Sequence, residues 1–580
     1  MARKKLPGEE KGMSLERKIL DEVVGKAEDY EASMTGFMAE VGEWAGLYKA
    51  VRPARKRGAF SNPRSTEFYR ASTALSTLMF RMMTSADPYF SCNAVDMGTS
   101  YDDLTTLLHV FKTQLKYSKY KQNLLRACNF MVPFGTVIAQ EDYRIVGVSP
   151  FGRRVPVTTF TPRVLDQVFF DRGTIDIDEA DWISTSDVTS NAALKRLAEE
   201  DDDLKTPWNK EALLEAAEMK ENSNTMNPRV LQRLTRNGSF SDDAFLAKKE
   251  MLMYYGKLDS LNDGVEYVCA LVNRKIMVRF HANRFQHGKR QFRIAKFVDF
   301  DSALGIGLGQ LAPLHRSMDA NMQKIQDSIA FATYSPWKRR KNTVDDEDLE
   351  IRPMQIINVD DPSDLTPLDV PTRGAEMGLK LDEILKQEFR NASGATDTLQ
   401  AILTEATTAS AVTLAQNEGM RRISVGTEIA AESLVREHLE VMHWNNVQNI
   451  KAPFNINRAG VATRVYPDQL KVDLEFETKV TTDKDFRPQR LEKLINLIQI
   501  LTSTKSQHPD QMSISILPLV KQVAYMLDVN PEDVIQGPTQ QPIMGAPELS
   551  GLGGLSVPSA PGGPAELASV PGGDVFVSPS

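Results

Sequence analysis

The chain has 580 residues, of which 41% are hydrophobic and 25% charged, and its formal net charge is −8. That length exceeds one compact core, so about three or four structural units are expected, with the composition of a folded soluble chain. A protein that grips duplex DNA tightly would normally carry a basic face, because phosphate neutralisation supplies most of that affinity. The acidic balance instead favours a surface that does not adhere to polyanions.

The cysteines and the first residues of the chain indicate the cellular compartment in which the protein is made. Cys92, Cys128 and Cys269 are few and widely spaced, which favours a reducing compartment over a disulfide framework. No run of about eighteen apolar residues could cross a membrane. Residues 1–14 are predicted to be a disordered, charged leader without the apolar segment of a secretory signal. We therefore expect a product made in the cytoplasm, with no membrane partner.

Three helical stretches are predicted in the first 130 residues. Residues 15–50 carry apolar side chains at helical spacing, and residues 62–83 repeat the pattern. Pro88 ends that region, and residues 101–130 are again mostly helical.

Strands are predicted next. After Pro133 the chain becomes strand-rich, and residues 155–170 are enriched in β-branched side chains. Residues 265–280 read as two short strands with a turn near Asn273-Arg274.

Two amphipathic helices form the most informative part of the chain. The first, predicted over 310–333, follows the glycine-rich run 305–309. Steps of three and four place one apolar stripe along it: Leu311, Leu314, Met318, Met322, Ile325 and Ile329. The second, predicted over 374–392, repeats this with Met377, Leu381, Ile384, Leu385 and Phe389. Two such helices joined by about forty residues predict a stalk with a small domain at its tip, which suits an assembly part better than an enzyme pocket.

The insert between these helices carries the best basic patch of the chain, Lys338, Arg339, Arg340 and Lys341, and then turns acidic. Two interpretations stay open. The patch is a solvated loop, or it contacts an acidic partner or DNA phosphates. In the second case, four charges could steer a polyanion but could not read a sequence.

The C-terminal part begins with residues 393–408, rich in Ala, Thr, Ser and Gly. A long helical pattern follows to about Asn449, with Gly419 and Gly426 as points where it could bend. A strand is predicted over 471–480. Two further helices are predicted over 488–501 and 513–527. Residues 536–580 are rich in Gly, Pro and Ser and are expected to be disordered.

Motifs for catalysis are missing from the sequence. The phosphate-loop pattern GxxxxGK[ST] does not occur, and the glycines at 305, 307 and 309 lack the spacing of a dinucleotide fingerprint. Neither CxxC, HExxH nor GxSxG is present. We therefore predict no catalytic residue, no cofactor, no metal site and no enzymatic activity.

The order of elements resembles the portal proteins of tailed bacteriophages, especially the head-to-tail connectors of short-tailed phages. The resemblance covers about residues 15–530 and rests on degenerate motifs. They are Phe297-Val298-Asp299-Phe300 before Gly305-Ile306-Gly307-Leu308-Gly309, Tyr334-Ser335-Pro336-Trp337, Ile356-Ile357-Asn358-Val359, Leu365-Thr366-Pro367-Leu368 and Thr404-Glu405-Ala406-Thr407-Thr408-Ala409. Pro88-Tyr89-Phe90 departs from the tryptophan form common in that family.

The resemblance implies an α+β, mainly helical fold assembled as a ring, usually of twelve subunits in that family. The implied parts are a wing (15–307 and 409–485), stem helices (310–333 and 374–392), a clip (334–373), a tunnel loop (393–408) and a crown (486–535). Candidate channel-facing residues of the tunnel loop are Ser393, Thr396, Asp397, Thr398, Gln400 and Thr404. A simple connecting loop is an equally open interpretation of that stretch.

The resemblance also implies a place and partners. The ring would occupy one capsid vertex of the virion and conduct double-stranded DNA, bound non-specifically, during packaging and ejection. Its partners would be the major capsid protein, the scaffold protein, the terminase large subunit and a tail adaptor protein. Two alternatives stay open: an enzyme of packaging, and a non-enzymatic helical scaffold or minor virion protein.

Overall fold

The computed structural model describes residues 14–52, 61–86, 88–95, 101–147, 154–171, 173–174, 179–199, 208–219, 248–283, 285, 287–299, 303–333, 337–339, 365–367, 373–395, 423–458, 461–480, 496 and 498–499. The chain divides into two compact units, Met1–Ile500 and Leu501–Ser580, and all described residues belong to the first. The predicted leader up to residue 13, almost all of the predicted crown and the predicted disordered tail lie outside the described residues.

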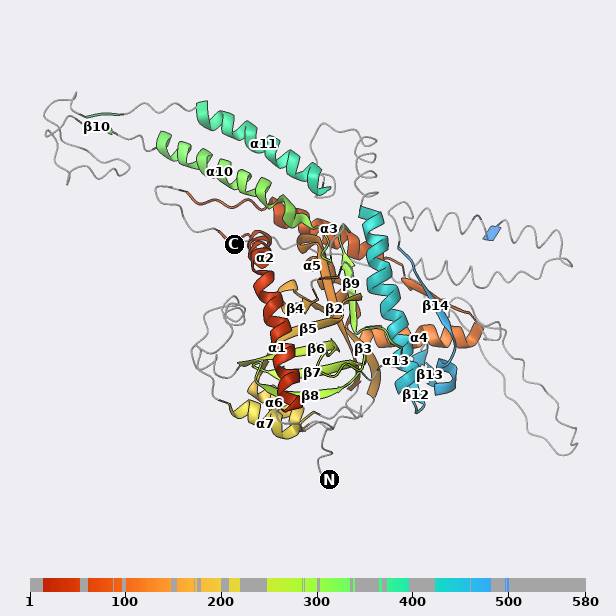
Figure 1. The fold of residues 1–580 in the computed structure, drawn as a ribbon. Coiled ribbons are helices and arrows are strands. Elements are labelled where there is room, and N and C mark those ends of the chain that lie inside the picture. The colour runs from red at the N-terminus through yellow and green to blue at the C-terminus, as the bar shows by residue number, and fades with distance from the viewer. Residues whose placement is uncertain are drawn as a thin grey trace, which may run out of the picture. The chain divides into compact units, whose positions relative to one another are not determined.

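Helices and antiparallel sheets are mixed along the chain, as the α+β class requires (Figure 1). The helices are α1 (Leu15–Ser33), α2 (Thr35–Tyr48), α3 (Glu67–Thr84), α4 (Tyr101–Tyr117), α5 (Tyr120–Phe134), α6 (Asn191–Glu199), α7 (Lys210–Glu218), α10 (Ala312–Thr333), α11 (Arg373–Ser393) and α13 (Glu437–Asn449). The strands are β1 (Phe90–Ala94), β2 (Thr136–Gly147), β3 (Arg154–Arg163), β4 (Val168–Phe170), β5 (Trp182–Ser190), β6 (Lys248–Lys257), β7 (Glu266–Val272), β8 (Ile276–Ala282), β9 (Phe292–Lys296), β10 (Trp337–Arg339), β11 (Leu365–Pro367), β12 (Phe454–Arg458), β13 (Val461–Val465) and β14 (Leu474–Thr478).

The largest sheet is an antiparallel meander in the order β4-β5-β6-β7-β8. Its last hairpin confirms the turn predicted at Asn273-Arg274, because both residues have positive φ, 51° and 58°, as two-residue hairpin turns require. Helix α1 packs on the sheet through a buried stripe at helical spacing, and its Tyr30 ring lies 5.7 Å from the ring of Phe169. Helices α6 and α7 form a second, smaller core with strands β6, β7 and β8.

A second sheet, in the order β3-β2-β9, packs against α5 and α13. Where β9 leads toward α10, the glycine run meets the end of α5. A Cβ on Gly307 would lie 2.3 Å from the backbone nitrogen of Gly135, and one on Gly309 would lie 2.2 Å from the Trp44 ring. Gly135 also has a φ of 83°, which favours glycine at a helix C-terminus. Close backbone packing therefore explains these glycines without a nucleotide.

Two distant pieces of chain complete this unit. Strand β1 pairs with β14, which joins residues 90–94 to residues 474–478. The long helix predicted up to Asn449 is described from residue 423 onward, and it contains one π turn, Glu432–Arg436, before α13. Gly426, a predicted bending point, lies within the helical stretch 423–431, and the π turn follows this stretch. The other predicted bending point, Gly419, lies outside the described residues.

Three helical stretches differ from the sequence prediction. The stretch predicted over 15–50 is two helices, α1 and α2, which meet at Met34. The helix predicted over 62–83 begins only at Glu67, because residues 61–66 are held against α10. The helical stretch predicted over 101–130 is two helices, since Lys119 adopts a left-handed φ of 56° between α4 and α5. The strand predicted over 471–480 is present as the shorter β14.

Candidate interaction surface on the α10–α11 helix pair

Helices α10 and α11 lie side by side and run antiparallel (Figure 1). Near one end, the rings of His315 and Phe389 are 6.1 Å apart and nearly perpendicular. Further along, the side-chain amide of Asn321 donates to the carbonyl oxygen of Gly378 at 2.9 Å. The first contact joins the start of α10 to the end of α11, and the second joins the middle of α10 to the first third of α11, which defines the antiparallel register.

Gly378 sets how closely the two helices approach. A Cβ at this position would lie 2.6 Å from Cγ1 of Ile325, closer than real side chains allow. Glycine is otherwise unfavourable inside a helix by about 1 kcal/mol relative to alanine. The close approach therefore accounts for a residue that local helix propensity disfavours.

The segment before α3 holds α10 by its acidic side chains. The carboxylate of Asp319 accepts hydrogen bonds from the Arg64 guanidinium at 2.8 Å and from the backbone N–H of Ser65 at 2.7 Å. Asp327 accepts from the backbone N–H of Ser61 at 2.8 Å and from its hydroxyl at 2.6 Å. Burial would raise the pKa of Asp319, but its partners, including His315, together lower that pKa. Both carboxylates are therefore anchors of the helix rather than free surface charges.

The opposite helix is anchored by a charged pair. Arg390 near the end of α11 donates to both carboxylate oxygens of Glu67, at 3.2 and 3.1 Å, and both side chains are largely buried. A two-point arginine–carboxylate contact fixes orientation as well as position. Contacts along α10 and at the end of α11 thus hold the helix pair to the segment 61–67.

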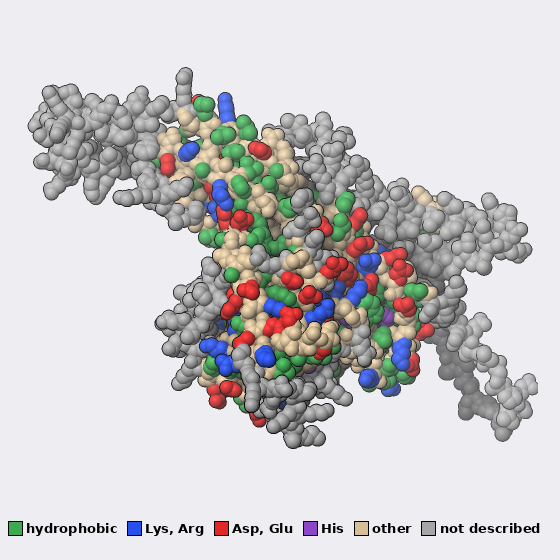
Figure 2. All heavy atoms as spheres, in the orientation of Figure 1, with side chains coloured by type: hydrophobic (Ala, Val, Ile, Leu, Met, Phe, Trp, Pro, Cys, Tyr) green, Lys and Arg blue, Asp and Glu red, His purple; other side chains and the backbone are tan. Residues whose placement is uncertain are grey.

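One flank of α11 is apolar and exposed. Met377, Leu381 and Ile384 follow at helical spacing and are 73%, 46% and 60% exposed. Leu379 is 54% exposed and lies about 160° from Leu381 around the axis of an ideal helix. Figure 2 shows hydrophobic side chains over the helix pair, whereas charges of both signs are interspersed over much of the remaining coloured surface in that view. The other side of α11 therefore carries one exposed apolar side chain, Leu379.

The predicted stem residues divide into several environments. Met318 and Ile325 are buried, while Leu311, Leu314 and Met322 are partly buried. Ile329 lies on the same face but is 50% exposed. The stripe predicted on α10 is therefore used mainly within the chain, and the buried side chains His315 and Asn321 belong to that face although the apolar pattern did not indicate them.

The predicted stripe on α11 is divided differently. Phe389 is fully buried and Leu385 partly buried on the face toward the core. The remaining members of the stripe form the exposed flank. Because the five apolar residues extend over more than one face of the helix, periodicity alone could not separate them.

The other predicted site residues are mostly outside the described part. Ser393 is the last residue of α11; it is buried, and its hydroxyl donates to the carbonyl of Arg390 at 3.1 Å. Lys338 and Arg339 lie on β10, which pairs with β11. Nothing is described of the remaining candidates, which are Thr396, Asp397, Thr398, Gln400, Thr404, Arg340 and Lys341.

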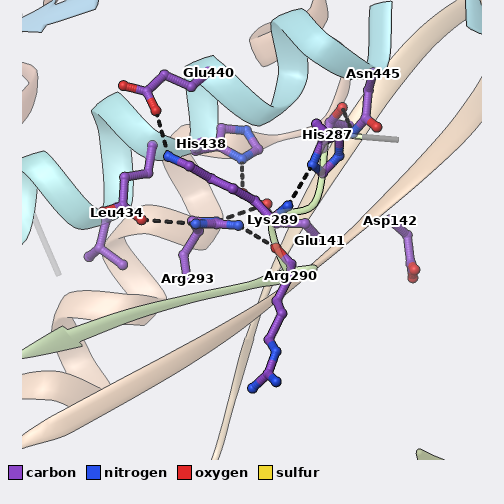
Figure 3. Close-up of polar contacts among 12 residues, drawn as sticks. Glu141, Asp142, His287, Lys289, Arg290, Arg293, Leu434, His438, Glu440 and Asn445 are labelled. Carbon is purple, nitrogen blue, oxygen red and sulfur yellow. Dashed lines mark hydrogen bonds and ion pairs between the residues drawn. The ribbon is translucent and has the colours of Figure 1, made fainter. Parts of the chain in front are cut away.

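A buried ionic network ties the long helix to the sheet β3-β2-β9 (Figure 3). Arg293 on β9 pairs with Glu141 on β2 at 3.1 Å and with Glu437 on α13 at 2.9 Å. Burial would lower the pKa of Arg293, but the carboxylates of Glu141 and Glu437 outweigh it and raise the pKa. Sequence patterns did not indicate this network, because its members are far apart along the chain.

His438 completes the network. Its Nδ1 lies 2.6 Å from a carboxylate oxygen of Glu141, and its ring stacks on the ring of Tyr120 at 4.8 Å. Its Nε2 is buried without a hydrogen-bond partner among the described residues. The Nδ1 contact and the ring stacking fix the position of the imidazole between Glu141 and Tyr120. We therefore interpret the network as structural support for the long helix.

Comparison of the sequence with protein-family models finds no matching family, and comparison with curated proteins finds no similar chain. None of the described helices combines the length and apolar character needed to cross a membrane. Within the described residues, no three His, Cys, Asp or Glu side chains are arranged to hold a metal ion.

Proposed function

We propose that this chain is the subunit of a portal-type ring, in which copies pack side by side through the α10–α11 helix pair. The ring would serve as a conduit for DNA at one capsid vertex and as a docking platform for the packaging motor and the tail. Docking would involve the insert between the two helices, which contains Lys338 and Arg339 on β10.

The observation that carries this proposal is the exposed flank of α11. A surface helix of a self-contained protein normally turns its apolar stripe toward the core. Here the core-facing positions of α11 include Gly378 and the buried Asp382, while Met377, Leu381 and Ile384 face outward. Covering these three side chains would contribute on the order of 4 kcal/mol per interface, given their exposed fractions.

The two-sided exposure favours a ring over a two-fold dimer. A heterologous contact joins two different surfaces, and it closes into a ring when the rotation between copies allows. The flank formed by Met377, Leu381 and Ile384 and the flank marked by Leu379 supply two different surfaces on one helix. A two-fold dimer would need only one.

The polar attachments of the helix pair suit this role. Asp319 and Asp327 hold α10 to residues 61–65, and Arg390 holds α11 to Glu67. A helix pair held in this way presents its flanks in one orientation, which would let identical copies repeat the same contact around a ring.

The test is the mass and shape of the full chain in solution. Sedimentation velocity and negative-stain images of the wild-type chain are expected to show closed rings with an axial hole. The triple variant Met377→Gln, Leu381→Gln, Ile384→Gln should not form rings. Its monomer should stay folded, as thermal unfolding would show, because these side chains are exposed and glutamine is a good helix former. A matched control is Leu214→Gln with Val265→Gln, which changes exposed apolar residues elsewhere.

Two results would contradict the proposal. One is a wild-type chain that stays monomeric at its highest soluble concentration. The other is a triple variant that still forms closed rings. Irregular or open assemblies would favour the helical scaffold instead.

A further inference from the structure

A cavity of about 430 Å³ lies where β1, the end of α4 and the start of α5 meet. Its lining comes from two stretches of chain, residues 88–90 and residues 112–122. This volume is in the range of sites for small organic ligands. The cavity is complete within one chain, so it does not require ring formation.

Four of the lining residues are lysines, Lys112, Lys116, Lys119 and Lys121, and no lining residue is acidic. Lys116, Lys119 and Lys121 are exposed, and none of the three forms an ion pair with another described residue. The chain as a whole carries −8. A cluster of uncompensated lysines on an acidic protein concentrates positive potential at one hollow, which favours an anionic ligand.

Aromatic side chains lie next to the lysines but are covered. Tyr120 and Phe90 are fully buried and Tyr89 is 6% exposed, and the rings of Tyr89 and Tyr120 are nearly parallel with centroids 6.5 Å apart. The ammonium group of Lys121 lies 5.4 Å from the centre of the Tyr89 ring. The groups that a ligand can reach are therefore mainly the lysines, which select for a negative group.

The kind of cation indicates phosphate rather than carboxylate. Arginine is over-represented where a planar carboxylate is gripped at two points, whereas lysine binds phosphate as a point charge. All the cations of this cavity are lysines. The start of α5 has no side-chain cap, so the positive end of that helix adds to the field of the lysines.

We propose that this cavity binds the phosphate of a nucleotide through Lys116, Lys119 and Lys121. The nucleotide is either free or one unit of a single-stranded nucleic acid, since both present the same phosphate chemistry.

The test uses the full chain and two kinds of probe. AMP and ATP are titrated by calorimetry, and a fluorescein-labelled oligothymidylate is titrated by anisotropy. The variant Lys116→Gln, Lys119→Gln, Lys121→Gln is expected to bind at least tenfold more weakly. For the oligonucleotide, the slope of log K against log salt should fall by about 0.7, as expected when the contact to one phosphate on a single strand is lost.

The matched control is Lys18→Gln, Lys49→Gln, Lys195→Gln, which removes the same charge from exposed positions elsewhere. Both triple variants should unfold at the wild-type temperature, and the control should keep wild-type affinity. Binding of AMP and ATP that is lost only in the cavity variant supports the site with a free nucleotide as ligand. Binding of the oligonucleotide alone, lost in the same way, supports the site with a strand as ligand.

Three results would overturn the inference. They are a wild-type chain that binds neither probe, equal loss of affinity in both triple variants, and competition by polyglutamate as effective as competition by the oligonucleotide at equal charge. Running the titrations on the monomeric α11 variant separates this inference from the proposed ring, because a site within one chain should still bind there.

Discussion

The hydroxyl of Tyr120 donates a hydrogen bond to the backbone carbonyl of Leu434 at 2.6 Å, inside the π turn Glu432–Arg436. A π turn changes the regular hydrogen-bond ladder of an α-helix, and such turns are often found at functional sites. Tyr120 is fully buried and also lines the lysine-rich cavity. One side chain therefore connects the cavity, the long helix and the ring of His438.

Replacing Tyr120 by phenylalanine should lower the free energy of unfolding by about 1–2 kcal/mol, because it removes the donor to a buried carbonyl. The control is Tyr267→Phe, whose hydroxyl bonds the exposed Asp263 and whose loss should cost little. Denaturant titrations of the two variants give the comparison. Equal stability of both would show that the bond to Leu434 contributes nothing net.

Replacing Arg293 by methionine should destabilise the chain by about 3–5 kcal/mol, because it leaves the carboxylate of Glu141 buried without its cationic partner. The nearby pair of Lys289 and Glu440 is considerably more exposed, so Lys289→Met should cost at most about 1 kcal/mol. Chemical unfolding measures both. A small effect of the Arg293 change would mean that water reaches Glu141.

Gly378→Ala should lower the stability of the helix pair even though alanine is the better helix former, because its Cβ would collide with Ile325. Gly374→Ala on the same helix is the control, since nothing lies within 4 Å of a Cβ there, and it should be neutral or stabilising. Thermal unfolding ranks the two variants. A Gly378 variant as stable as the Gly374 variant would show that the helices can separate at no cost.

The contacts of Glu22 predict that the stability of the chain depends on pH. Its carboxylate accepts from the backbone N–H groups of Asp259 and Ser260 and pairs with Lys26 at 2.7 Å. Burial would raise its pKa, but the hydrogen bonds from Lys26 and Ser260 lower the pKa from 4.5 to about 2. Since the folded pKa is the lower one, the stabilisation is complete above pH 4.5 and is lost as the pH falls toward 2.

Glu22→Gln should therefore destabilise the chain by about 1–2 kcal/mol at neutral pH, and the gap to the wild type should shrink below pH 4.5. The exposed Asp21 on the same helix provides the control, Asp21→Asn, whose gap should stay small at every pH. Unfolding midpoints measured across the acid range give the result. A gap for Glu22→Gln that does not change with pH would contradict the assignment.

The cysteines should be unreactive in the folded chain. Burial raises the pKa of Cys92 to about 11 and those of Cys128 and Cys269 to about 12, so few thiolates exist at neutral pH. A chromogenic disulfide reagent should label none of them quickly in the native state and all three after unfolding. Rapid native labelling of Cys128 or Cys269 would show that the core opens around them.

Local patterns were enough to predict several elements. The helical spacing of apolar residues located α10 and α11 to within about two residues, a margin typical of helix ends. The hairpin turn at Asn273-Arg274 was also predictable, because turn residues and flanking strands are neighbours in sequence.

The same patterns could not separate exposed from buried apolar positions. Met377 and Phe389 belong to one predicted stripe, yet only Phe389 meets Phe68 and His315 in the core. The lysine-rich cavity was also invisible, because it needs Tyr89 beside the turn that contains Lys119. The burial of Phe389 and the cavity both depend on contacts between segments that are far apart along the chain.

The sequence by itself determined the positions of the paired helices, the alternation of helix and strand, and the net charge of −8. Only the tertiary structure decided that Glu141, Arg293 and His438 converge and that Met377, Leu381 and Ile384 are exposed among the described residues. The physical reason is that periodicity records which side of an element is apolar, whereas burial and ion pairing depend on contacts between residues far apart along the chain.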